Sequence, residues 1–124
     1  MQRPLRFLLC LLAGLAAAGV RGAEHVAWGD QGDGTFRNPI LPADFSDLDA
    51  VRVGADYYAI SSTLHQSPGM VVLHSRDLVN WQIVGHVVAD VTALSPEMNW
   101  DRMNLYGRGV WAGAIRHHAG RFWV

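Results

Sequence analysis

Three carboxylates lie close together in the sequence, in the pattern Asp44-x-x-Asp47-x-Asp49, and Trp111 follows 64 residues after Asp47. An ionised carboxylate can serve as a general base, and a flat aromatic ring can pack against the C–H face of a sugar. Together these two groups predict a site that acts on glycosidic bonds. In the alternative interpretation, Asp47 is a turn residue and Trp111 is a core residue. A calcium site at the three aspartates is a weaker alternative, because the glycine and the distal glutamate of a known calcium loop are absent.

The segments that must position these side chains are short and rich in β-branched and aromatic residues. Turn-forming residues separate them, which predicts an antiparallel meander. After residue 22 no segment has a helical apolar stripe, and residues 90–107 are expected to form a long connecting loop. The expected strands are Ala50–Val53, Tyr57–Thr63, Gly69–Ser75 and Trp81–Val88.

A weak internal repeat extends this pattern. Val51-Arg52 aligns with Ile115-Arg116 at an offset of 64, with one extra residue in the second turn, and the same offset pairs Asp47 with Trp111. Four strands followed by the start of a second unit are typical of a β-propeller. Because a propeller needs at least four blades, we expect the chain to be the N-terminal part of a longer protein. A complete sandwich of about six strands is the alternative.

The composition excludes several classes of protein. The 124 residues include ten arginines, no lysine and 11 acidic residues, which gives a formal net charge of −1. This balance argues against a nucleic-acid-binding module. The single cysteine, Cys10, excludes a disulfide framework and a cysteine-based zinc site. We therefore expect no nucleic-acid partner, no cofactor and no bound metal.

Residues 1–22 have the composition of an export signal. Arg3 and Arg6 precede an apolar segment of 12 residues, 7–18, and small residues follow it. The segment is shorter than the roughly 20 apolar residues of a transmembrane helix, so it predicts a signal peptide that is cleaved. We expect the mature protein to be secreted or periplasmic, with no membrane association after cleavage. Residues 23–36 are predicted to be a linker, and residues 37–124 part of the folded domain.

Five short motifs occur in order along residues 37–124. They are Asn38-Pro39-Ile40-Leu41, the segment Phe45–Gly54, Asp56-Tyr57-Tyr58 with Ser61-Ser62-Thr63, the segment Leu73–Trp81, and Gly109-Val110-Trp111-Ala112. In this order and spacing the sequence resembles glycoside hydrolase family 43, whose members act on xylan, arabinoxylan and arabinan side chains. Leu48 and Gly113 depart from the family pattern, since each stands where proline is usual.

The resemblance implies an all-β fold, a five-bladed β-propeller of which this chain holds the first blade and the start of the second. It implies an exported, inverting hydrolase of β-xylosides or α-L-arabinofuranosides. The expected partner is an oligosaccharide or polysaccharide substrate such as xylan, arabinoxylan or arabinan.

The resemblance also implies roles for individual residues. Asp47 would be the general base, with Asp44 and Asp49 as rivals. Trp111 and Leu64 would bind the terminal sugar, and ordinary core packing is the alternative for Leu64. The general acid and the aspartate that tunes its pKa would lie beyond Val124, so the chain alone is expected to be inactive. A non-catalytic carbohydrate-binding propeller is the alternative function.

Overall fold

The computed structural model describes residues 29–99, 101–102 and 107–124. The predicted signal peptide, residues 1–22, lies outside the described residues. The described part is all-β, as predicted, apart from two short 3-10 turns. Its elements are β1 Asp49–Val53, β2 Asp56–Ser61, β3 Gly69–Ser75, β4 Gln82–Val88, η1 Val91–Ala93, η2 Pro96–Met98, β5 Arg116–His118 and β6 Arg121–Trp123. Within it, no helix is long and apolar enough to cross a membrane.

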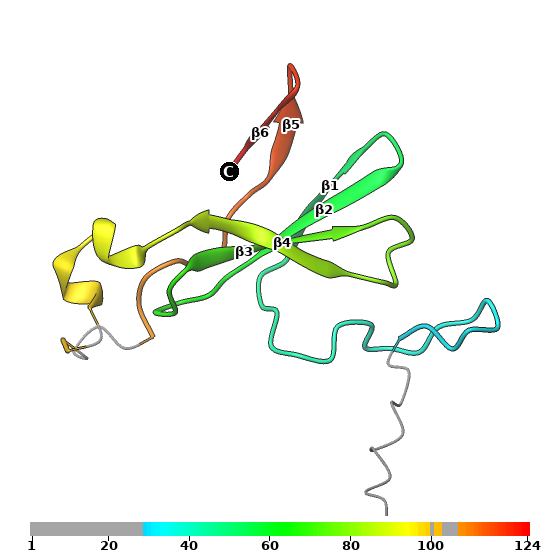
Figure 1. Cartoon of the computed structure of the whole chain (residues 1–124), viewed down its shortest axis with the longest axis horizontal. Coiled ribbons are helices and arrows are strands. Elements are labelled where there is room, and N and C mark those ends of the chain that lie inside the picture. The colour runs from blue at the N-terminus through cyan, green and yellow to red at the C-terminus, as the bar shows by residue number, and fades with distance from the viewer. Residues whose placement is uncertain (1–28, 100, 103–106) are drawn as a thin grey trace, which may run out of the picture.

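Strands β1 to β4 form one antiparallel sheet in sequence order, so the predicted meander is confirmed. Strands β5 and β6 form a separate hairpin that projects from the sheet (Figure 1). β2 ends at Ser61, two residues before the predicted end at Thr63. It ends early because the next two N–H groups bond outside the sheet: Ser62 donates to the Ser46 carbonyl at 3.1 Å, and Thr63 to the Val110 carbonyl at 3.2 Å.

Both faces of the sheet are covered by apolar side chains, because successive residues of a strand point to opposite sides. One face carries the buried Ala59, Val71 and Leu73, with Leu41, Phe45 and Trp81 packed against them. The other carries Ile60, Met70 and Ile115, with Val51, Tyr58, Val72 and Val110 packed against them. The segment before β1 therefore covers one face, and the segment before β5 covers the other.

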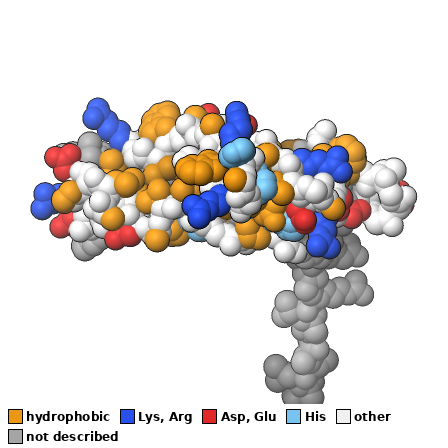
Figure 2. Space-filling model, turned by 90° about the horizontal axis from the view of Figure 1, so that it is seen from above, with side chains coloured by type: hydrophobic (Ala, Val, Ile, Leu, Met, Phe, Trp, Pro, Cys, Tyr) orange, Lys and Arg blue, Asp and Glu red, His pale blue; other side chains and the backbone are white. Residues whose placement is uncertain are grey.

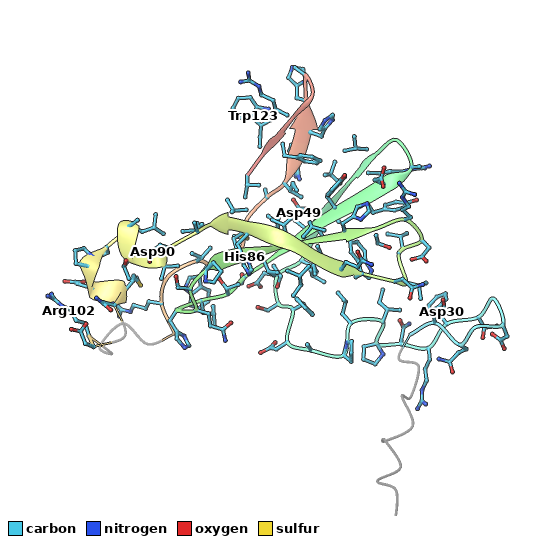
Figure 3. The ribbon with its side chains drawn as sticks, viewed as in Figure 1. Asp30, Asp49, His86, Asp90, Arg102 and Trp123 are labelled. Carbon is cyan, nitrogen blue, oxygen red and sulfur yellow. The ribbon has the colours of Figure 1, made fainter. Side chains whose placement is uncertain are left out.

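The described part of the predicted linker folds into a compact loop. The Arg37 N–H donates to the Gly29 carbonyl at 2.8 Å, and Asp30 and Phe36 form an isolated β-bridge. The side-chain amide of Asn80 donates to Asp30 Oδ2 at 3.0 Å. Figure 3 shows Asp30 in this loop. The bond from Asn80 joins the loop to the turn that precedes β4.

Large apolar side chains remain exposed on β4 and β6. Ile83 and Val84, neighbours on β4, are 59% and 54% exposed, and Trp123 on β6 is 58% exposed. Figure 2 shows hydrophobic side chains over much of the surface seen from above. An edge strand with exposed apolar side chains can pair with or pack against further β structure.

The repeat is real as a pair of hairpins, but its predicted alignment is wrong by one residue. In the first hairpin Val53 pairs with Asp56, and in the second His118 pairs with Arg121, so each turn has two residues. No extra residue lies in the second turn, and the hairpins align at an offset of 65 (118 − 53). Asp47 then corresponds to Ala112 and not to Trp111.

Candidate active site

Asp47 lies in the loop that leads into β1, and its carboxylate is held from the end of β2. The Ser62 hydroxyl donates to Asp47 Oδ2 at 2.7 Å. Ser62 is buried and Asp47 is exposed. The backbone of Asp47 has φ 54°, in the left-handed region, which aspartate and asparagine tolerate better than most residues. The loop therefore presents a carboxylate to solvent on a backbone that few other residues would adopt.

The residue before Asp47 is fixed by two hydrogen bonds to its carbonyl. The Ser61 hydroxyl donates to the Ser46 carbonyl at 2.7 Å, and the Ser62 N–H donates to the same oxygen at 3.1 Å. A carbonyl oxygen has two lone pairs, and both are used here. The end of β2 therefore holds Asp47 in two ways. The Ser46 carbonyl, which precedes Asp47, is bonded to Ser61 and Ser62, and the Asp47 carboxylate is bonded to the Ser62 hydroxyl.

A second bridge brings the segment that carries Trp111 to the same end of β2. The Leu64 N–H donates to the Val110 carbonyl at 2.9 Å, and the Val110 N–H returns to the Leu64 carbonyl at 2.8 Å. Gly109 makes this approach possible. It has φ +123°, and a Cβ built on it would lie 2.2 Å from the Leu64 carbonyl oxygen. Residues 61–64 therefore contact both the Asp47 loop and the Trp111 segment.

Leu64 and Trp111 are placed differently from core residues. Leu64 is half-buried and has φ 52°. Trp111 is 57% exposed, so within the described residues it is not a core side chain. Leu64 pairs through its backbone with Val110, the residue before Trp111. The side chains of Leu64 and Trp111 therefore belong to two segments that are bonded to each other. An exposed indole can stack on the apolar face of a ligand.

Asp49 is occupied by structural contacts. Its Oδ2 accepts a hydrogen bond from the Ile115 N–H at 2.8 Å and one from Arg116 Nη1 at 2.6 Å. The bond from Ile115 and then the Arg116 guanidinium hold the pKa of Asp49 below its usual range. In Figure 3 Asp49 lies where the chain toward β5 passes the start of β1. Asp49 therefore joins the two hairpins, and this engagement sets it apart from Asp47.

Asp44, the other rival, lines the same cavity as Ser62, whose hydroxyl holds the Asp47 carboxylate. This cavity has a volume of about 400 Å³, and Gln66, His86 and other residues also line it. Among residues 29–99, 101–102 and 107–124, no group of three or more His, Cys, Asp or Glu side chains could hold a metal ion. The three aspartates of the sequence pattern thus have three different surroundings.

Sequence reasoning missed three residues that build this site. Ser61 and Ser62 read as the end of a β-strand, and no local pattern distinguishes a serine that holds a carboxylate 15 residues away. Gly109 belongs to a recognised motif, but its role depends on the carbonyl of Leu64, which is distant in sequence. Gly113 stands where proline is usual in the family, and the structure gives a steric reason for the glycine. A Cβ there would lie 2.8 Å from Met70 Cε and 3.0 Å from Ile60 Cδ1.

Solved structures of glycoside hydrolases share this arrangement of strands. A bifunctional GH43-CE protein from Bacteroides eggerthii matches with a TM-score of 0.63 and 45% identity over 69% of this chain and 12% of its own. A xylan β-1,4-xylosidase from Bacillus halodurans matches with a TM-score of 0.59 and 37% identity over 69% of this chain and 16% of its own. These similarities place the chain among the glycoside hydrolases.

The family follows from the sequence comparison. The model of glycosyl hydrolases family 43 matches residues 36–124. The chain belongs to this family, and the resemblance seen in its motifs is confirmed.

Two curated relatives show how much of such a protein the chain represents. A β-xylosidase from Formosa agariphila is 52% identical over 101 residues, which are 82% of this chain and 17% of the relative. A non-reducing-end α-L-arabinofuranosidase from Bacteroides ovatus is 39% identical over 119 residues, which are 94% of this chain and 20% of the relative. The chain thus spans about a fifth or less of the length of these relatives.

Proposed function

We propose that this chain is the N-terminal part of an exported family 43 hydrolase that cleaves β-xylosides or α-L-arabinofuranosides of hemicellulose with inversion. The names of the two relatives above, a β-xylosidase and an α-L-arabinofuranosidase, support this range of substrates. Residues 1–22 would direct export and be removed.

The propeller is part of the same proposal. The sheet β1–β4 would be the first blade of a five-bladed propeller, and the hairpin β5–β6 would begin the second. The equal turns of the two hairpins support this, as does the Asp49 contact that joins them. The apolar surface of β4 would then be covered by the rest of the propeller.

Asp47 would act as the general base, and the observation that carries this role is its hydrogen bond from the buried Ser62. In an inverting hydrolase, one carboxylate takes a proton from the water that attacks the anomeric carbon. A carboxylic acid about 6.5–9.5 Å away gives its proton to the departing glycosidic oxygen. We propose that this acid comes from a part of the protein other than residues 1–124, and that residues 23–124 alone do not hydrolyse a nitrophenyl glycoside.

Trp111 and Leu64 would form a wall of the sugar subsite. The aromatic ring offers a flat apolar face to sugar C–H groups, and Leu64 adds apolar contact beside it. The bridge between Leu64 and Val110 fixes the spacing of the two segments, which supports a preformed wall.

The test is the change Asp47→Asn in the full-length protein that contains this chain. Asparagine tolerates the left-handed backbone at this position and keeps an oxygen that can accept the Ser62 hydrogen bond, but it cannot take a proton from water. General-base catalysis contributes a factor of about 10²–10⁴, so kcat on a nitrophenyl xyloside or arabinofuranoside should fall by that factor with little change in KM.

Asp49→Asn is the matched control, because Asp49 lies two residues away and is engaged by Ile115 and Arg116. Its kcat should stay close to the native value. Loss of kcat in Asp49→Asn with a normal Asp47→Asn would transfer the role to Asp49. Normal kcat in both variants would exclude both aspartates as the general base. Binding of the oligosaccharide without hydrolysis by the native full-length protein would favour the non-catalytic carbohydrate-binding module.

A further inference from the structure

Ser62 is a buried polar residue beside the loop that carries Asp47. It follows the last residue of β2, is 6% exposed, and directs its hydroxyl at the carboxylate of Asp47, whose oxygen lies 2.7 Å away. An ionised carboxylate only accepts hydrogen bonds, so Ser62 is the donor. The distance is that of a short, charge-assisted bond.

The backbone of Ser62 reinforces the contact of its side chain. Its N–H donates to the Ser46 carbonyl at 3.1 Å, so Ser62 binds the residue before Asp47 as well as the Asp47 carboxylate. The two bonds close a small ring between the end of β2 and the loop. The hydrogen bond from Ser62 restricts rotation of the Asp47 carboxylate, and the left-handed backbone of Asp47 fixes the direction in which its side chain leaves the chain.

The two carboxylate oxygens of Asp47 are therefore not equivalent. Oδ2 accepts a hydrogen bond from Ser62, and within the described residues Oδ1 accepts none. Asp47 as a whole is exposed. A general base must lie about 2.6–3.2 Å from the group whose proton it takes, and an error of about 1 Å in placement can cost about 100-fold in rate.

We propose that Ser62 is a positioning residue, which holds Oδ2 of Asp47 so that Oδ1 is aimed at the attacking water. This inference rests on the proposed role of Asp47 and adds a residue to it. Ser62 would act through Asp47 and not by contact with the sugar or the attacking water. Ser61 has a different part, because its hydroxyl bonds to the Ser46 carbonyl and not to the carboxylate.

The first experiment is Ser62→Ala in the full-length protein. The change removes one oxygen atom and leaves the backbone bond to Ser46 in place. A hydrogen bond to a charged group has an effect of about 10- to 100-fold on an equilibrium, and we expect kcat to fall by about that factor while KM stays within about twofold.

Ser75→Ala is the control for a buried serine. Ser75 is 2% exposed and accepts a hydrogen bond from the Leu78 N–H at 2.9 Å. It is the last residue of β3, whereas Ser62 follows Ser61, which pairs with Val71 near the start of β3. Removal of the Ser75 hydroxyl should lower the midpoint of urea unfolding and leave kcat unchanged. A fall in kcat as large as that of Ser62→Ala would mean that any loss of a buried serine hydroxyl slows the enzyme, and would overturn the proposal.

A double-mutant cycle separates positioning from a general structural role. In the Asp47→Asn background no base remains to be aimed, so adding Ser62→Ala should change the residual kcat by less than about twofold. An equal fall in both backgrounds would overturn the proposal. Normal kcat in Ser62→Ala with an inactive Asp47→Asn would also overturn it and leave the proposed function standing. Full activity of Asp47→Asn would instead refute the proposed role of Asp47 as the general base, on which this inference rests.

Discussion

The change Gly109→Ala tests how the Trp111 segment is held against the end of β2. Gly109 has φ +123°, and a Cβ at this residue would lie 2.2 Å from the Leu64 carbonyl oxygen. The closest ordinary contact between carbon and oxygen is about 3.3 Å, so the two segments would have to separate by roughly 1 Å. The obstacle is backbone, which cannot rotate away as the end of a side chain could.

The size of the effect follows from the bonds that this separation breaks. Three backbone bonds join the segments: Val110 N–H to the Leu64 carbonyl at 2.8 Å, and the Leu64 and Thr63 N–H groups to the Val110 carbonyl at 2.9 and 3.2 Å. Each contributes about 1 kcal/mol net. A non-glycine residue in a sparsely populated backbone region adds about 1–3 kcal/mol. We expect Gly109→Ala to lower the free energy of unfolding by roughly 4–6 kcal/mol.

Urea unfolding of the full-length protein measures this loss, and Gly107→Ala is the matched control. Gly107 also has a positive φ, +77°, but a Cβ there would have no heavy atom of the described residues within 4 Å. Only the backbone cost of about 1–2 kcal/mol should appear. The kcat/KM of Gly109→Ala should fall as well, because Trp111 lies two residues further along the displaced segment. Equal losses of stability in the two variants would refute the steric argument.

Three further predictions concern other contacts. Asp49→Asn should lower the midpoint of urea unfolding at pH 7. The folded-state pKa of Asp49 is lowered, so its carboxylate stabilises the native protein above about pH 4 and loses this effect as the pH falls further. The difference in midpoint between the variant and the native protein should therefore shrink below about pH 4. Trp111→Ala should raise KM for a nitrophenyl xyloside about tenfold with a smaller change in kcat, since burying an aromatic side chain contributes about 1.5 kcal/mol or more; an unchanged KM would exclude stacking. Mass spectrometry of the exported protein should find its N-terminus near residue 23, and an intact Met1 would contradict the predicted cleavage.

The strands were predictable because their cause is local. β-branched and aromatic residues alternate over short runs, and turn-forming residues such as Gly54 lie between them. The four predicted strands of the meander are all present, and β3 has the predicted bounds. The error at the end of β2 arose because Ser62 and Thr63 satisfy their N–H groups on Ser46 and Val110, which are remote in sequence.

The repeat shows how a one-residue error propagates. The sequence suggested an extra residue in the second turn, but both turns have two residues. A shift of one residue moves every side chain of a strand to the opposite face. The inferred correspondence of Asp47 with Trp111 therefore does not hold, although the two residues remain candidates on other grounds.

The sequence by itself determined the β class, the meander, the family and the identity of the candidate residues, because these depend on residue types, short-range alternation and ordered motifs. The tertiary structure decided which groups hold each aspartate: Asp49 accepts a hydrogen bond from Ile115, 66 residues away, and Asp47 accepts one from Ser62, 15 residues away. It also decided that Gly109 must be glycine, since a carbonyl from another segment lies where its side chain would be. Such roles arise from contacts between distant segments, and no local pattern of residues encodes them.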